Sequence, residues 1–174
     1  FVAALSDEVA TLVVGPPLDE ATEVSALISS GDTERGKGWI DDAVAAGAKV
    51  AVGGDVGDDG VLRPTVLTEV TPDMKIYKEE IFGPVLTLVR AKDYEEAVRL
   101  PSEHEYGNGV SIFTRDGDTA RDFTSRVNVG MVGVNFAIPV PLAYHTFGGW
   151  KRSGFGDLNQ HGPDSIRFYT KTKT

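Results

Sequence analysis

The sequence has 174 residues, a formal net charge of −9 and 41% hydrophobic residues. This length suits one domain with a core of its own, and the negative charge argues against nucleic acid or an anionic membrane as the main partner. There is no cysteine, which excludes disulfides, thiolate metal sites and a cysteine nucleophile within these residues.

The first residues predict a helix over 1–12, because Phe1, Leu5, Val9 and Leu12 recur at helical spacing. No N-cap residue precedes this pattern, so we expect a fragment of a longer protein or a processed one. The segment has no basic region typical of a secretory signal, and no apolar run approaches the roughly 18 residues of a membrane span. We therefore expect a cytoplasmic protein.

A second helix is predicted over 33–46, capped by Asp32 or Thr33. Short strands are expected at 49–52 and 64–67. The acidic stretch between these strands lacks two of the ligand positions of a calcium loop, so a solvated hairpin tip is expected there.

From residue 85 onward, strand patterns and helix patterns alternate regularly. The expected strands cover residues 85–90, 110–114 and 131–135. Asp93 and Glu96 predict a capping box for a helix over 94–100, and Asp116 or Asp118 caps the next helix. Strands of buried character that alternate with helices are typical of an α/β fold with a parallel sheet.

The end of the chain lacks this alternation of strand and helix patterns. Residues 136–164 are rich in Gly and Pro and show no periodicity, which favours a long functional or packed loop. Residues 166–173 alternate apolar and polar, which predicts a strand with one buried face that needs a sheet edge to join. That edge could belong to another subunit.

The segment KEEIFGPV, residues 78–85, is the strongest candidate site. Glu80 and Phe82 are two residues apart, so extended backbone would direct both side chains to the same side. A carboxylate can accept two hydroxyl hydrogens of a sugar, while an aromatic ring packs against a flat heterocycle. The alternative is a charged loop with Phe82 packed in the core.

No complete catalytic constellation is recognisable by motif. A nucleophile elbow, an S-x-x-K arrangement, a P-loop and a G-x-G-x-x-G fingerprint are all absent, and the three histidines lack metal-ligand spacing. Gly148-Gly149 would let backbone approach a partner closely. Lys151 and Arg152 could bind a carboxylate or phosphate, although a solvated surface pair is the favoured interpretation.

Taken in order, KEEIFGPV, VLTLVR, VGVN and FGGWKRSGFGD resemble the C-terminal half of the aldehyde dehydrogenase superfamily. The resemblance covers essentially the whole chain and is greatest to the coenzyme A-acylating branch, the methylmalonate-semialdehyde dehydrogenases. It implies a three-layer α/β catalytic domain of aldehyde dehydrogenase type, 1–162, with the C-terminal segment 163–174 as the oligomerisation strand.

The resemblance also implies residue roles. Glu80 corresponds to the glutamate that holds the nicotinamide-ribose hydroxyls of NAD, and Phe82 to the phenylalanine beside the nicotinamide. Phe147 corresponds to an aromatic residue near the aldehyde pocket, although Thr146 stands where common members have Pro. No metal site is implied.

In this family a cysteine attacks the aldehyde, hydride passes to NAD, and the acyl group is released to water or to coenzyme A. That cysteine would precede a position matching Phe1, so the chain alone is expected to be inactive. The resemblance implies an NAD-dependent, coenzyme A-acylating (methylmalonate or malonate) semialdehyde dehydrogenase of valine catabolism, cytoplasmic and homo-oligomeric. The alternatives are a non-acylating member, an acyl-phosphate reductase, or a non-catalytic assembly module.

Overall fold

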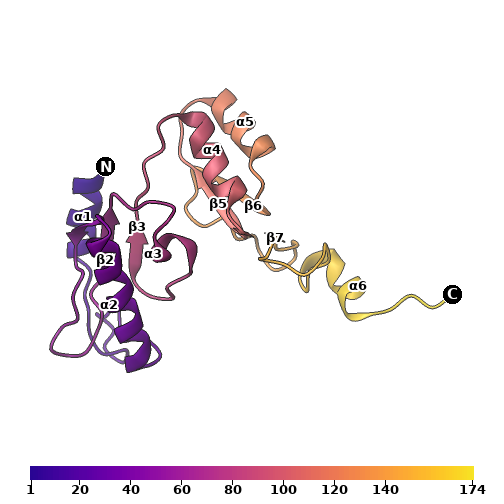
Figure 1. Ribbon diagram of the computed structural model, residues 1–174. Coiled ribbons are helices and arrows are strands. Elements are labelled where there is room, and N and C mark those ends of the chain that lie inside the picture. The colour runs from indigo at the N-terminus through magenta and orange to yellow at the C-terminus, as the bar shows by residue number, and fades with distance from the viewer. The chain divides into compact units, whose positions relative to one another are not determined.

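The computed structural model describes residues 1–174 (Figure 1). The chain divides into two compact units, Phe1–Arg90 and Ala91–Thr174. Both combine helices with a pair of parallel strands, so the predicted α/β class is confirmed. None of the helices combines the length and apolarity that crossing a bilayer requires.

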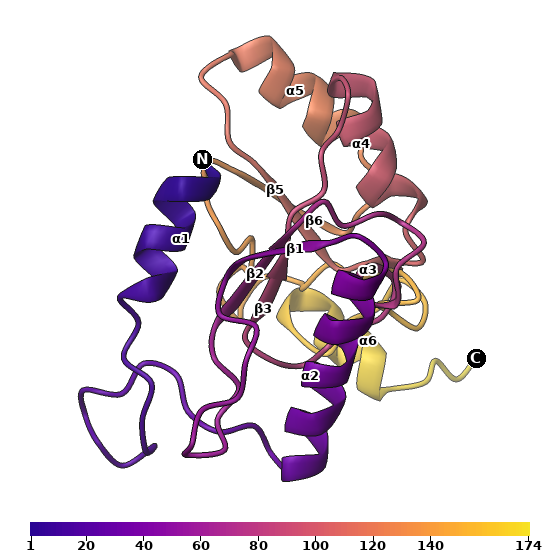
Figure 2. The ribbon, with the colours of Figure 1, turned by 60° about the vertical axis from the view of Figure 1, so that its left-hand side comes forward.

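The first unit holds three helices and a three-stranded sheet. Its elements are α1 (Val2–Ala10), α2 (Ser30–Ala45), β1 (Lys49–Val52), β2 (Thr65–Thr68), α3 (Lys75–Lys78) and β3 (Val85–Thr87). The strands lie side by side in the order β1-β2-β3 (Figure 2). β2 runs antiparallel to β1 and parallel to β3, with Thr65 opposite Val85. The sequence predicted a strand at the position of β1, but it did not predict that this strand would pair antiparallel with β2.

Helix α2 begins earlier than predicted. Ser29, not Asp32 or Thr33, is its N-cap: the Ser29 hydroxyl accepts a hydrogen bond from the Asp32 N–H at 3.2 Å. Thr33 is buried inside the helix. The glycine at position 36 has a packing role, because a Cβ there would lie 3.1 Å from the Leu62 side chain.

The core of the first unit forms between α2 and the sheet. Three of its side chains are 1% exposed or less: Ile40 of α2, Leu67 of β2, and Leu62, which precedes β2. Burying an aliphatic side chain of this size contributes about 1.5–3 kcal/mol. Ile81, immediately after the Glu80 position, is partly buried against this same cluster.

The second unit contains more elements, several of them short. They are α4 (Tyr94–Glu103), β4 (Tyr106–Gly107), β5 (Gly109–Ile112), α5 (Gly117–Arg126), β6 (Met131–Val134), β7 (Trp150–Lys151), η1 (Gly162–Asp164) and α6 (Ser165–Tyr169). β5 and β6 pair in parallel, and β4 pairs antiparallel with β7. Helices α4 and α5 lie next to one another (Figures 1 and 2). Val98 of α4 and Phe123 of α5 pack with Val110 of β5 in a second core.

The two long helices of this unit start at carboxylate caps, as predicted. Asp93 accepts a hydrogen bond from the Glu96 N–H at 2.9 Å, and Asp116, rather than Asp118, accepts one from the Thr119 N–H at 2.6 Å. The Glu96 carboxylate accepts from the N–H of Lys92 at 2.9 Å, one residue before the position of an ordinary capping box.

The strand predicted for residues 166–173 is wrong for the single chain. Ser165–Tyr169 form α6, and the residues from Thr170 onward have no regular structure. An isolated strand has no partner for its backbone groups, whereas a helical turn satisfies them locally. The Thr170 hydroxyl, for example, donates to the carbonyl of Ile166 at 2.6 Å. The role of 163–174 in oligomerisation stays a prediction.

Candidate functional site

The candidate segment connects α3 to β3 and is fixed at both ends. Glu79 ends α3, with its N–H donating to the Lys75 carbonyl at 2.9 Å. At the other end, the Pro84 carbonyl accepts from the Thr65 N–H at 2.8 Å, where the parallel ladder between β2 and β3 begins. The four residues between Glu79 and Pro84 therefore connect two anchored positions in the first unit.

The middle of this segment is held by an arginine of α2. Arg35 donates from Nη2 to the carbonyl oxygen of Ile81 at 3.2 Å, and its guanidinium also pairs with Asp32. The Ser29 hydroxyl and Arg35 together hold the pKa of the Asp32 carboxyl below its usual range. Because the Ile81 side chain packs on the core while its carbonyl is bound by Arg35, the backbone between Glu80 and Phe82 is fixed from both sides.

Glu80 and Phe82 themselves are exposed. The Phe82 side chain is 75% exposed, so the alternative in which it packs into the core is wrong. Its backbone has φ of 49°, so the expected extended conformation is also wrong at this residue. A bulky side chain in the left-handed region costs of order 1 kcal/mol or more, and such strain is common at binding sites.

The structure distinguishes the two carboxylates of the KEE sequence. Glu79 lies 3.9 Å from the ammonium of Lys75, one helical turn away. Glu80 has no hydrogen-bond or ion-pair partner in the chain. A carboxylate that is exposed, unpaired and carried on fixed backbone is free to accept hydrogen bonds from a hydroxyl-bearing ligand.

The third predicted site residue, Phe147, belongs to the second unit. It is half-buried and lines a cavity of about 430 Å³ formed by residues of 146–160 together with Asn108 and Phe168. Its ring stacks on the imidazole of His161, with ring centroids 4.2 Å apart and planes 14° apart. Its carbonyl accepts from Asn159 Nδ2 at 2.6 Å. Glu80 and Phe82 are neighbours in the first unit, and Phe147 sits in a cavity of the second.

Gly148 and Gly149 allow a close backbone approach, but the partner is within the chain. A Cβ on Gly148 would lie 2.5 Å from the carbonyl carbon of Gly130, and one on Gly130 would lie 2.5 Å from the N atom of Gly149. Gly154 packs against the Gly149 carbonyl in the same way. These glycines are needed for close packing within the chain. Gly148 and Gly149 also line the cavity beside Phe147, so the approach to a partner outside the chain stays a prediction.

Lys151 and Arg152 are both engaged inside the chain. The Lys151 ammonium donates to the carbonyls of Pro101 and Ser102, each at 3.0 Å, in the last turn of α4. Burial lowers the pKa of Lys151. Arg152 pairs with Glu105 and lies over the Tyr106 ring. The anion site considered for this pair is therefore filled by the protein's own groups.

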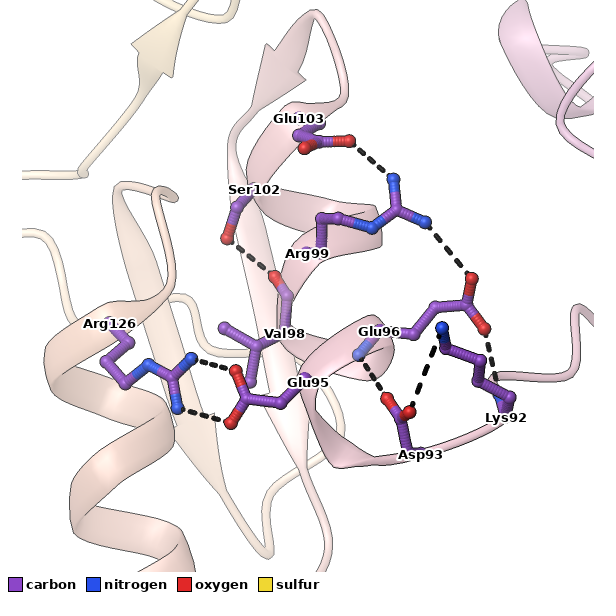
Figure 3. A pocket seen from close by; sticks show the side chains of 9 residues that line it. All are labelled: Lys92, Asp93, Glu95, Glu96, Val98, Arg99, Ser102, Glu103 and Arg126. Atoms are coloured by element: carbon purple, nitrogen blue, oxygen red, sulfur yellow. Dashed lines mark hydrogen bonds and ion pairs between the residues drawn. The ribbon is translucent and has the colours of Figure 1, made fainter.

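A charged surface groove lies between α4 and α5 (Figure 3). Arg126 makes a bidentate pair with Glu95, and Arg99 bridges Glu96 and Glu103. Because each of these charged groups already has an ion-pair partner beside it, the groove is an ion-pair network rather than a ligand site. No group of three or more His, Asp or Glu side chains is placed to hold a metal ion.

Sequence reasoning did not identify Asn159 and His161 as neighbours of Phe147. They follow it by 12 and 14 positions in a segment without periodicity, where no spacing rule predicts contact.

Comparison with known proteins gives a consistent result. A model of the aldehyde dehydrogenase family matches residues 1–174. The chain belongs to the aldehyde dehydrogenase family. It is 47% identical over 179 residues to the malonate-semialdehyde dehydrogenase of Pseudomonas aeruginosa and 36% identical over 176 residues to that of Bacillus subtilis (strain 168). These alignments cover 99% of the chain and 36% of each relative, so the chain spans about a third of the relatives it matches.

Solved structures of this family agree. A Sinorhizobium meliloti protein, assigned as a methylmalonate-semialdehyde dehydrogenase and solved with NAD, is 54% identical with a TM-score of 0.92, covering 99% of the chain and 36% of that protein. The methylmalonate-semialdehyde dehydrogenase of Oceanimonas doudoroffii is 45% identical with a TM-score of 0.92, covering 98% and 36%. Betaine aldehyde dehydrogenase of Staphylococcus aureus with NAD⁺ is 32% identical with a TM-score of 0.87, covering 96% and 34%. The predicted family and fold are thus confirmed.

Proposed function

We propose that the chain is the C-terminal part of an NAD-dependent, coenzyme A-acylating dehydrogenase of malonate or methylmalonate semialdehyde. Family membership and the names of the relatives support the reaction class and the substrate. Coenzyme A as acyl acceptor, a place in valine catabolism and a cytoplasmic location rest on the resemblance and composition described above. The chain has no cysteine, so the nucleophile would come from residues outside these 174.

The observation that carries the proposal is the exposed pair Glu80 and Phe82 on a fixed segment. The Glu80 carboxylate has no partner in the chain, and its two oxygens can accept hydrogen bonds from both hydroxyls of a ribose. The Phe82 ring offers a flat apolar face to the neighbouring heterocycle. NAD, when bound, supplies the acceptor for the hydride that leaves the aldehyde carbon.

Phe147 has a different proposed role. It lines the cavity of the second unit with an apolar ring, which suits contact with the carbon chain of a small aldehyde.

Homo-oligomerisation through residues 163–174 is the remaining part of the proposal. Ile166 and Tyr169 are exposed apolar residues there, and a partner's sheet edge would be required for this segment to become a strand.

The test is NAD⁺ binding by the full-length polypeptide, measured by calorimetry, for Glu80→Gln and for Glu79→Gln as the matched control. Hydrogen bonds to a charged group contribute about 1.5–3 kcal/mol, so Glu80→Gln should raise the Kd for NAD⁺ by about tenfold or more. Glu79, which already has Lys75 beside it, should tolerate the same change. Equal Kd values for the two variants would refute the assignment of Glu80.

A further inference from the structure

We propose that His161 and Asn159 are positioning residues for Phe147, fixing its ring and its backbone so that one wall of the cavity keeps a defined shape. The inference rests on the proposed function, in which that wall meets the aldehyde. Neither residue is expected to touch the reacting atoms. Both would act through Phe147.

The ring of Phe147 is held by the imidazole. A centroid separation of 4.2 Å with planes 14° apart is a stacked arrangement, in contrast to the nearby Tyr144–His145 pair, whose planes are tilted by 50°. The Nδ1 atom of His161 is buried and has no hydrogen-bond partner, although the residue as a whole is only partly buried, so the stacked face is the contact that places the imidazole. A flat ring packed face to face restricts rotation of Phe147 about its side-chain bonds.

The backbone of Phe147 is held by a single amide that also holds the histidine. Asn159 Nδ2 donates to the Phe147 carbonyl at 2.6 Å, and Asn159 Oδ1 accepts from the His161 N–H at 3.3 Å. The Asn159 amide therefore forms one hydrogen bond with the backbone of each member of the stacked pair. This bridge sets the distance between the two backbones.

A second connection joins Thr146, the residue before Phe147, to residues that follow His161. The Thr146 hydroxyl donates to Asp164 Oδ2 at 3.1 Å, across 18 positions of sequence. Gly162 has φ of 69°, and a Cβ there would lie 2.6 Å from the Thr146 N atom. Residues 146–147 and 159–164 thus form one packed unit, in which the position of the Phe147 ring depends on the residues after 158.

The experiment compares His161→Ala, His161→Phe and Asn159→Asp in the full-length polypeptide, with His145→Ala as the matched control. His145 is an exposed histidine of the same segment, and its ring packs against Tyr144. Loss of one stacked ring pair should raise the KM for the semialdehyde roughly 2- to 10-fold, with the Kd for NAD⁺ unchanged. His161→Phe keeps a flat ring and should restore the KM. Asn159→Asp keeps the shape but loses the donor, and should behave like His161→Ala.

A spectroscopic measurement reads the ring directly. With para-fluorophenylalanine at position 147, His161→Ala and Asn159→Asp should shift or broaden the fluorine NMR signal, and His161→Phe should keep one sharp line. The positioning role is overturned if these two variants leave the signal and the KM unchanged, or change them no more than His145→Ala does. Phe147→Ala separates the two proposals. If Phe147→Ala leaves the aldehyde KM unchanged, the assignment of Phe147 to the aldehyde pocket fails. The fluorine signals of the labelled His161 and Asn159 variants still test whether these residues position the ring.

Discussion

Replacing Lys151 with Met should destabilise the second unit more than any other charge removal in the FGGWKRSG segment. The Met side chain keeps the length of the lysine stem but removes the ammonium that binds the carbonyls of Pro101 and Ser102. These are among the last carbonyls of α4, which have no partner within the helix and favour a cation nearby. Lys151 also has φ of 56°. Because Met carries a Cβ just as Lys does, this backbone strain is the same in both proteins and does not contribute to the difference.

The magnitude follows from the two bonds. A hydrogen bond to a charged group contributes about 1.5–3 kcal/mol, but carbonyls at a helix end become partly hydrated when the ammonium is lost. We therefore expect a loss of about 2 kcal/mol for both bonds together, above the 0.3–1 kcal/mol of an exposed dipole interaction. With a urea dependence of about 1 kcal/mol per molar for a unit of this size, the unfolding midpoint should fall by about 2 M.

The chain offers a reporter for each unit, because Trp39 lies in the first and Trp150 in the second. In a Trp39→Phe background, the fluorescence of Trp150 follows urea unfolding of the second unit. Arg152→Met is the matched control, since its ion pair with Glu105 is solvent-exposed and should matter little. If Lys151→Met moves the midpoint no further than Arg152→Met does, the ammonium does not stabilise the end of α4.

Two further predictions concern the same unit. Gly148→Ala should cost about 2 kcal/mol or more, because its Cβ would meet the backbone of Gly130. Gly117→Ala, where a Cβ meets open space, should cost nothing on the same Trp150 assay, and equal effects would contradict the packing argument. Hydrogen bonds from Arg126 hold the pKa of Glu95 below its usual range, so the unfolded chain binds more protons than the folded chain once the pH falls toward about 4. Stability contributed by this pair is present above that pH and lost below it. Glu95→Gln should therefore flatten the pH dependence of Tm between about pH 5 and pH 3. If the variant shows the same slope of Tm against pH as the unchanged protein, the Glu95–Arg126 pair does not contribute this stability.

Local signals in the sequence predicted much of the fold. The caps Asp93 and Asp116 were readable because a cap bonds a backbone N–H only three residues ahead. The strand at 49–52 was readable from its apolar run between turn residues. The strand predicted near the terminus failed because alternation describes a strand's faces but not whether a sheet edge is available.

The roles of Glu80, Phe82 and Phe147 stay predictions, and only their surroundings in the chain can be compared with the sequence. Glu80 and Phe82 came from an ordered pair of motifs, but the motifs predicted neither the positive φ of Phe82 nor the bond from Arg35 to the Ile81 carbonyl, 46 positions away. The structural use of Lys151 depends on α4, about 50 positions away in sequence. Contacts at such separations are decided by tertiary packing, which neither spacing nor propensity encodes.

The most direct test of the proposed function is NADH formation from malonate or methylmalonate semialdehyde in the presence of NAD⁺ and coenzyme A. The full-length polypeptide should form NADH together with the acyl-coenzyme A product. The 174-residue chain alone should form none, because it contains no cysteine to attack the aldehyde. NADH formation by the isolated chain, or none by the full-length polypeptide, would contradict the proposal.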